Sequence, residues 1–236
     1  MSEQGGSADF AGYDEVLYLE VPIPAAQVRV RYDRERYDVK RSPLFEAKVN
    51  ETWERRLAAN PHLFNALKFR VGSVEKRIDS SGKTIVDLGI GICDYATFLG
   101  TNRHPDATFV QELKKEGQKT FNDPSALLAS PLGNTALVIT NDGCVPLQRR
   151  SLRTAEFAGW WDTPGGHPEP SRVGITDSKA TIPNLEQSIV KELFLAMQEE
   201  VHSELNVPYE FIGEPLFGGI LAHQVSHGRP GALLCV

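Results

Sequence analysis

The amino-acid sequence predicts an α/β fold, and two kinds of pattern carry this prediction. Short apolar or alternating stretches at 16–21, 27–32 and 67–70 are typical of strands. The stretch 181–207 instead carries an apolar residue at every fourth position, which at about 100° per residue forms one stripe along a helix. The stripe consists of Leu185, Ile189, Leu193, Met197, Val201 and Leu205. Strands and helices of this kind bury their apolar faces against one another, so we expect helices packed on sheets.

The remaining chain divides into two expected domains. Residues 1–12, rich in Gly, Ser and Ala, are predicted to be a disordered lead. Cap and proline signals predict helices at 43–60 and 105–116. The Pro-Leu-Gly segment after Ser130 is interpreted as a linker. We therefore expect an N-terminal α+β domain at 13–133 and a second domain at 134–236.

Composition excludes several classes of protein. The 236 residues are 41% hydrophobic and 24% charged, which is ordinary for a globular protein. A formal charge of -6 gives the chain no overall positive charge with which to bind nucleic acid or an anionic membrane. No apolar run is long enough to span a membrane. Cys93, Cys144 and Cys235 form no metal-ligand spacing and leave at least one thiol unpaired. We expect a cytoplasmic or nuclear protein, and its protein partners stay unknown.

The end of the long helix carries two acidic residues where apolar ones are expected. Helical geometry places Glu200 and Glu204 about 20° to either side of Leu193, inside the stripe. Two carboxylates one turn apart repel each other and are costly to bury, unless a shared cation compensates them. A hard divalent ion with oxygen ligands would do so. The alternative is that the stripe narrows there and both point into water. Glu192 and Glu199 fall on another sector, which we interpret as a solvated face.

A glycine-rich turn precedes this helix. Residues 162–170 include Pro164, Gly165 and Gly166, and two glycines let the main chain approach a phosphate or a metal closely. Turn and helix together therefore predict a site for a metal-bound phosphate.

This combination resembles the Nudix box, which reads G, five residues, E, seven residues, then R-E-U-x-E-E-x-G-U, with U aliphatic. The residues that fit are Gly166, Glu200, Val201, Glu204 and Val207. The departures are Glu199 for the arginine, Ser203 for a helix glutamate, Asn206 for the glycine and Arg172 for the first-half glutamate. Extra residues also separate the two halves, and a surface loop is where they cost least. In the family the arginine and the first-half glutamate orient the loop against the helix. Their joint replacement implies a different clasp, with Glu169 and Arg172 as candidates.

Four segments resemble one branch of that family. GGHPEP, FNALKFR, FLGTN and KELFLAMQEEVHSELNVP are similar to the motif-22 Nudix proteins, which are UDP-glucose diphosphatases. The resemblance implies a Nudix α/β/α sandwich with a mixed sheet, preceded by a small α+β domain. It implies hydrolysis of UDP-glucose or UDP-galactose to UMP and the sugar 1-phosphate. Mg²⁺ would be held by Glu200 and Glu204, with Mn²⁺ as a substitute. Such a sandwich normally continues beyond residue 236, so we expect the Nudix domain to be truncated at the C-terminus.

The resemblance and the local patterns suggest further site residues. Arg149 and Arg150 end a predicted hairpin around Asn141-Asp142-Gly143, and alternation sends one of them toward Gly165 and Gly166, where a diphosphate would lie. In the branch, the segment at 95–102 lies near the sugar nucleotide. There Tyr95 and Phe98 would stack on the base and Asn102 would supply a polar contact, although core packing is the simpler role for Phe98. The catalytic candidates are Glu200, Glu204 and Glu169, and the general base stays open between Glu169, Glu192 and Glu200.

Two other functions fit parts of the sequence. Ser203 in a ligand position and an incomplete domain would suit a nucleotide-sugar binder without turnover. The segment from Thr84 to Asp94 contains Asp-Leu-Gly-Ile-Gly, which begins like the nucleotide loop of an S-adenosylmethionine-dependent methyltransferase. However, Cys93 stands where the third glycine is wanted, so a structural strand is the preferred interpretation.

Overall fold

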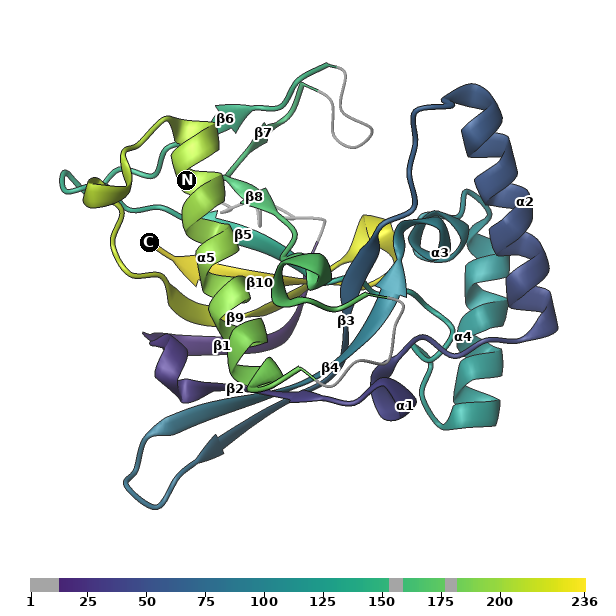
Figure 1. Ribbon diagram of the computed structural model, residues 1–236, viewed down its shortest axis with the longest axis horizontal. Helices are drawn as coiled ribbons and strands as arrows, with labels where there is room; N and C mark the ends of the chain where they lie inside the picture. Colours follow the sequence, from purple (N-terminus) through teal and green to yellow (C-terminus); the bar gives the residue numbers. More distant parts are fainter. Residues whose placement is uncertain (1–12, 153–158, 177–181) are drawn as a thin grey trace, which may run out of the picture.

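The computed structural model describes residues 13–152, 159–176 and 182–236. Its larger sheet is mixed and has five strands in the order β1-β9-β10-β5-β8 (Figure 1). In that order the strands are Tyr13–Ile23, Leu216–His223, Arg229–Cys235, Gly133–Leu137 and Gly165–Gly166. Strands β10 and β5 run parallel, and the other neighbours run antiparallel. The α/β class expected from the sequence is confirmed.

A second sheet has three strands in the order β2-β4-β3. Strand β4 (Thr84–Asp94) is central, parallel to β2 (Val28–Tyr32) and antiparallel to β3 (Leu67–Ile78). The Asp-Leu-Gly-Ile-Gly run is therefore paired strand on both sides, with no nucleotide loop at its glycines. A Cβ on Gly91 would lie 2.2 Å from the Tyr37 carbonyl carbon, so glycine is needed there for backbone packing. These contacts remove the basis for the methyltransferase alternative.

Helix α5 (Leu185–Leu205) packs on the five-stranded sheet and also contacts β2 (Figure 1). Its stripe is buried, as predicted, in a core that both sheets share. The fully or nearly fully buried members of the stripe are Ile189, Leu193, Met197 and Val201. Burying these side chains away from water stabilises the packing of the helix on the sheet, by about 1.5 to 3 kcal/mol for each large side chain.

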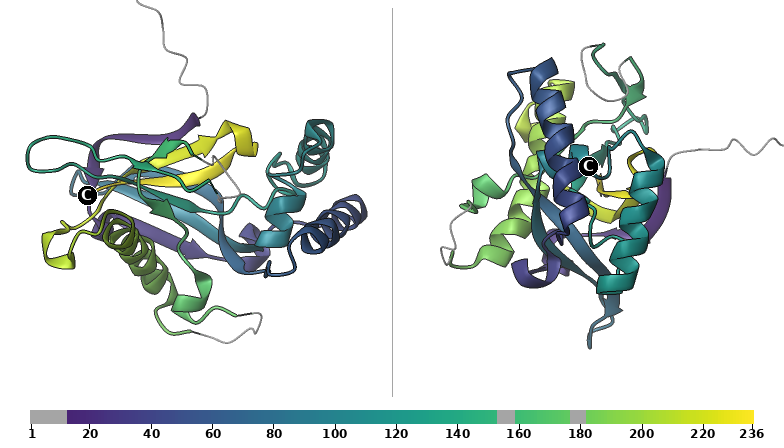
Figure 2. Two further views of the ribbon diagram at one scale, coloured as in Figure 1. Left: turned by 90° about the horizontal axis from the view of Figure 1, so that it is seen from above. Right: turned by 90° about the vertical axis from the view of Figure 1, so that its right-hand side faces the viewer.

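Three further helices gather at the far end of the three-stranded sheet (Figure 2). They are α2 (Pro43–Ala59), α3 (Tyr95–Gly100) and α4 (Ala107–Phe121), and they enclose a second apolar core. Strand β1 pairs with β9, so the chain on either side of the expected boundary at residue 133 contributes to one sheet and one core. The division into two domains stays a prediction, and the expected disordered lead at 1–12 lies outside the described residues.

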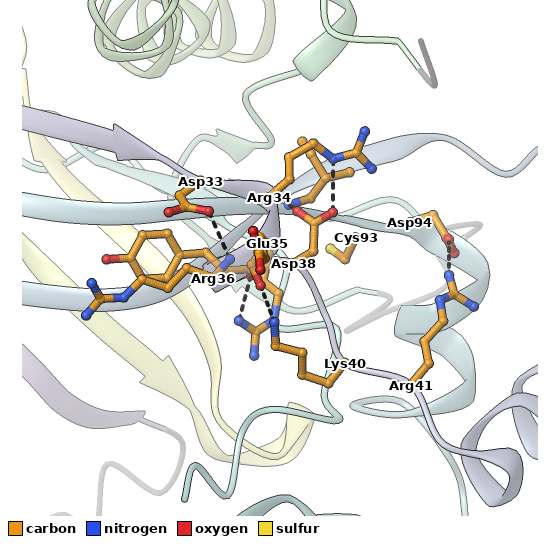
Figure 3. A network of polar contacts seen from close by, with 12 residues as sticks. Asp33, Arg34, Glu35, Arg36, Asp38, Lys40, Arg41, Cys93 and Asp94 are labelled. Carbon is orange, nitrogen blue, oxygen red and sulfur yellow. Dashed lines mark hydrogen bonds and ion pairs between the residues drawn. The ribbon is translucent and has the colours of Figure 1, made fainter. Parts of the chain in front are cut away.

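The charged segment around α1 (Arg34–Tyr37) makes polar contacts within itself and with its neighbours (Figure 3). Arg34 pairs with Asp38 at 3.0 Å, and Asp33 caps the helix by accepting a hydrogen bond from the Arg36 backbone N–H. Asp38 also accepts the Ile92 backbone N–H at 2.7 Å, which ties this segment to β4. The segment therefore acts in folding.

Two local expectations were wrong. The turn at Asn141-Asp142-Gly143 forms, but β6 (Gln148–Arg149) pairs with β7 (Trp161–Asp162) and not with β5. The truncation expected at the C-terminus would leave the last strand without neighbours, whereas β10 lies between β9 and β5. Among the described residues, no helix is long and apolar enough to cross a membrane.

Candidate active site

The last turns of α5 lie against the glycine turn. Strand β8 consists of two glycines, which pair with Asn134 and Thr135 at the edge of the sheet. The Gly165 N–H donates to Glu204 Oε2 at 3.0 Å, and the Gln148 side-chain amide donates to the same oxygen. Glu204 is exposed, yet these two donors direct its carboxylate toward the turn.

Glu200 occupies the space that a side chain at Gly166 would need. A Cβ on Gly166 would lie 1.9 Å from Glu200 Oε1, so only glycine admits the carboxylate. Burial raises the pKa of Glu200 to about 7, and the charges of Glu204, Glu199 and Glu169 add to this effect. A half-buried carboxylate among like charges favours a cation beside it.

Glu192 overturns the interpretation of its sector as solvated. Its side chain is buried, at 5% exposure, and Oε1 accepts the Glu169 backbone N–H at 3.0 Å. Arg172 Nε lies 3.7 Å from Glu192 Oε2. The Arg172 guanidinium also donates through Nη1 and Nη2 to the two oxygens of Glu199. The turn and helix are thus joined by a different clasp, with the arginine on the turn and the glutamates on the helix.

A polar cavity of about 250 Å³ opens beside the glycine turn. Its basic side chains are Arg150, which pairs with Asp162 at 3.1 Å, and Arg229 from β10. Arg149 is outside the lining, and its Nε donates to the Gly159 carbonyl. Sequence reasoning missed Arg229 and His223, because nothing local marks residues more than fifty positions beyond the turn as its neighbours.

A second cavity of about 330 Å³ is mainly apolar and lined by aromatic side chains. Tyr95 and Phe98 line it, and Phe98 also packs in the second core. His167 lines both cavities, so they adjoin at this residue. Burial lowers the pKa of His167 to about 4, and its Nδ1 lies 3.0 Å from the Leu132 carbonyl oxygen. The imidazole is therefore neutral at pH 7, with Nδ1 as the donor.

Asn102 has a structural role in place of the expected substrate contact. Its side chain is 0% exposed and lines neither cavity. Oδ1 accepts the Ser130 N–H at 2.8 Å, and Nδ2 donates to the Ser226 carbonyl at 3.2 Å. Ser130 has φ of 44°, a left-handed conformation that costs free energy in a non-glycine residue. Asn102 helps to hold that conformation.

The acidic side chains fit a hard divalent ion of low protein coordination. No group of three or more metal-ligating side chains occurs among the described residues. Glu200 and Glu204 still provide two carboxylates at one glycine turn. Magnesium is commonly bound through one or two carboxylates, with waters and substrate phosphates completing its shell.

A helix that presents paired carboxylates to a glycine turn, on an α/β fold with mixed sheets, defines the class of Nudix hydrolases. No family model matches the sequence. Curated relatives match it nonetheless. The bovine (Bos taurus) uridine diphosphate glucose pyrophosphatase NUDT22 is 36% identical over 219 residues, covering 92% of this chain and 74% of that protein. The human (Homo sapiens) NUDT22 is 34% identical over 220 residues, covering 92% and 71%. Nudix hydrolase 9 of Arabidopsis thaliana is 31% identical over 226 residues, covering 91% and 70%. The chain belongs to the Nudix hydrolase family, as the sequence resemblance predicted.

Proposed function

We propose that this protein hydrolyses the pyrophosphate bond of a UDP-sugar, with UDP-glucose or UDP-galactose as substrate. Water adds across the bond, which gives UMP and the sugar 1-phosphate. The observation that carries the proposal is the contact of Glu200 and Glu204 with the Gly165-Gly166 turn. The names of the bovine, mouse and human relatives support the choice of substrate.

The two cavities suit the parts of such a substrate. The polar one offers Arg150 and Arg229, whose guanidinium groups suit phosphate oxygens, beside main chain that bears no side chain at Gly165 and Gly166. The adjoining apolar one offers Tyr95 and Phe98 to a nucleobase. His167, which lines both cavities, is neutral and so places no charge where they adjoin.

Glu200 and Glu204 would hold Mg²⁺, or Mn²⁺ in its place. The ion, when bound, would neutralise charge on the phosphoryl oxygens and lower the pKa of a water. The protein's part is positioning. Gly165 fixes Glu204 through its N–H, and Gly166 leaves room for Glu200. Glu192 is the poorer candidate for the general base, because its Oε1 already accepts the Glu169 backbone N–H. The Glu169 side chain is the better candidate because it is exposed, with its Oε1 3.8 Å from Lys68 Nζ.

The test is incubation of the protein with UDP-glucose and MgCl₂, with UMP measured by chromatography. We expect UMP release that EDTA abolishes. Glu200→Gln should lower the rate at least about a hundredfold, the scale set by loss of one preorganised charged group. The matched control is Glu210→Gln, an exposed glutamate after the helix that should leave the rate unchanged.

Another outcome would assign another function. Saturable UDP-glucose binding without UMP release would overturn hydrolysis and support a nucleotide-sugar binder, for which Ser203 in a ligand position is the sequence argument.

A further inference from the structure

We infer that Arg172 is a positioning residue which, by bridging Glu192 and Glu199, sets the placement of the Gly165-Gly166 turn against Glu200. Arg172 lies in the 3-10 turn η2 (Pro170–Val173), six residues after the end of the short strand β8. The inference concerns how this chain aligns the two halves of its site, and its activity test rests on the proposed function.

The contacts form two fastenings between the loop and the helix. The first is the Glu169 backbone N–H on Glu192 Oε1 at 3.0 Å. The second is the Arg172 guanidinium, which donates to both oxygens of Glu199 and lies 3.7 Å from Glu192 Oε2. Glu192 and Glu199 are seven residues apart, or about two helical turns, so one guanidinium reaches both along one side of α5.

The clasp lies close to the catalytic carboxylate in the chain on both sides. Glu199 directly precedes Glu200, and Glu169 follows Gly166 by three residues. Fixing 169–172 on 192–199 therefore restricts sliding between Gly166 and Glu200. Burial raises the pKa of Glu192, and the Glu169 N–H and Arg172 oppose this rise.

The contribution of the clasp should appear in turnover more than in stability. Arg172 and Glu199 side chains are 42% and 40% exposed, and exposed ion pairs add little to folding. A misplacement of about 1 Å at a reacting centre, in contrast, can cost about a hundredfold in rate. If the Arg172 ion pair had only a structural role, its loss would lower turnover in proportion to the loss of stability.

The test compares Arg172→Met with Arg77→Met. Arg77 is a matched control because its side chain is also 42% exposed and also donates through two nitrogens to one carboxylate, that of Asp87 on the β3–β4 hairpin. We expect a similar small loss of thermal stability in both variants. R172M should lower kcat at least about tenfold with little change in KM, and R77M should leave both unchanged.

A double variant separates coupling from independent effects. Glu199→Gln should also lower kcat, and R172M with E199Q should be no slower than R172M alone, because both remove one interaction. Losses that multiply in the double variant would overturn the inference. So would an R172M effect that matches its loss of folded protein, or unchanged kcat in R172M.

Hydrogen exchange provides a measurement that does not depend on activity. We expect the peptide containing the Gly165 and Glu169 amides to exchange at least about tenfold faster in R172M than in R77M, since both amides donate to helix carboxylates. Faster exchange in a protein whose wild type releases no UMP would uphold the clasp and refute the proposed function. Unchanged exchange would refute the clasp whatever the activity.

Discussion

The contact between Gly166 and Glu200 yields the sharpest prediction. In Gly166→Ala the new Cβ would lie 1.9 Å from Glu200 Oε1 and 2.6 Å from its carboxyl carbon. Ordinary contacts begin near 3.4 Å, so the carboxylate has to retreat by about 1.5 Å. A shift of this size should lower kcat for UDP-glucose by roughly a hundredfold and weaken Mn²⁺ binding. Steady-state kinetics and paramagnetic resonance of bound Mn²⁺ measure the two effects.

The control is a glycine in the same sheet with room for a methyl group. A Cβ on Gly218 in β9 meets its nearest neighbour, Cys235 Sγ, at 3.5 Å, which is ordinary contact. Gly218→Ala should therefore keep its kcat and Mn²⁺ affinity. If G166A retained more than half of the wild-type kcat and bound Mn²⁺ as tightly, Glu200 could not be working from this position.

Two further predictions concern stability. The pKa of Glu200 rises from 4.5 to about 7 on folding, so the metal-free folded protein binds a proton more tightly and loses stability as pH rises through that window. Glu200→Gln should thus raise the free energy of unfolding by about 1 to 2 kcal/mol at pH 8 in EDTA, after allowance for solvent screening, and by little at pH 4; urea unfolding at both pH values measures this, and a larger gain at pH 4 would contradict it. Asn102→Ala removes the bonds to Ser130 and Ser226 and should cost about 2 to 4 kcal/mol with KM for UDP-glucose unchanged. A raised KM in folded N102A would return Asn102 to the substrate site.

Short-range pattern was sufficient for the long helix and for the central pair of carboxylates. The four-residue spacing of its apolar stripe is a local property, so it predicted which side of α5 is buried and placed Glu200 and Glu204 within that side. Glu200 is half-buried there, whereas Glu204 is exposed. The glycine turn was likewise visible, because glycines next to proline restrict the local backbone to few conformations. The family was recognised from these two features, the glycine turn followed along the chain by the helix.

Predictions from local sequence patterns were wrong where a segment far away in the chain determines whether a side chain is buried. Glu192 was assigned to water because its sector of the helix holds charged residues, and it is buried because the turn at 169–172 covers it. Asn102 was assigned to the substrate site because its segment resembles one that lies near the sugar nucleotide in the related branch. Its side chain is instead buried and bonded to the Ser130 N–H and the Ser226 carbonyl. Neither partner is within a helical turn of the residue concerned.

The sequence by itself determined the class of fold, the amphipathic helix, the glycine turn and the family, since each depends on residues a few positions apart. Only the tertiary structure decided that β10 lies inside the sheet, that Arg229 joins Arg150 at the polar cavity and that Arg172 bridges Glu192 and Glu199. The physical reason is that strand pairing and charge pairing join any segments that packing brings together. Because these segments lie far apart along the chain, their pairing leaves no periodic pattern in the sequence.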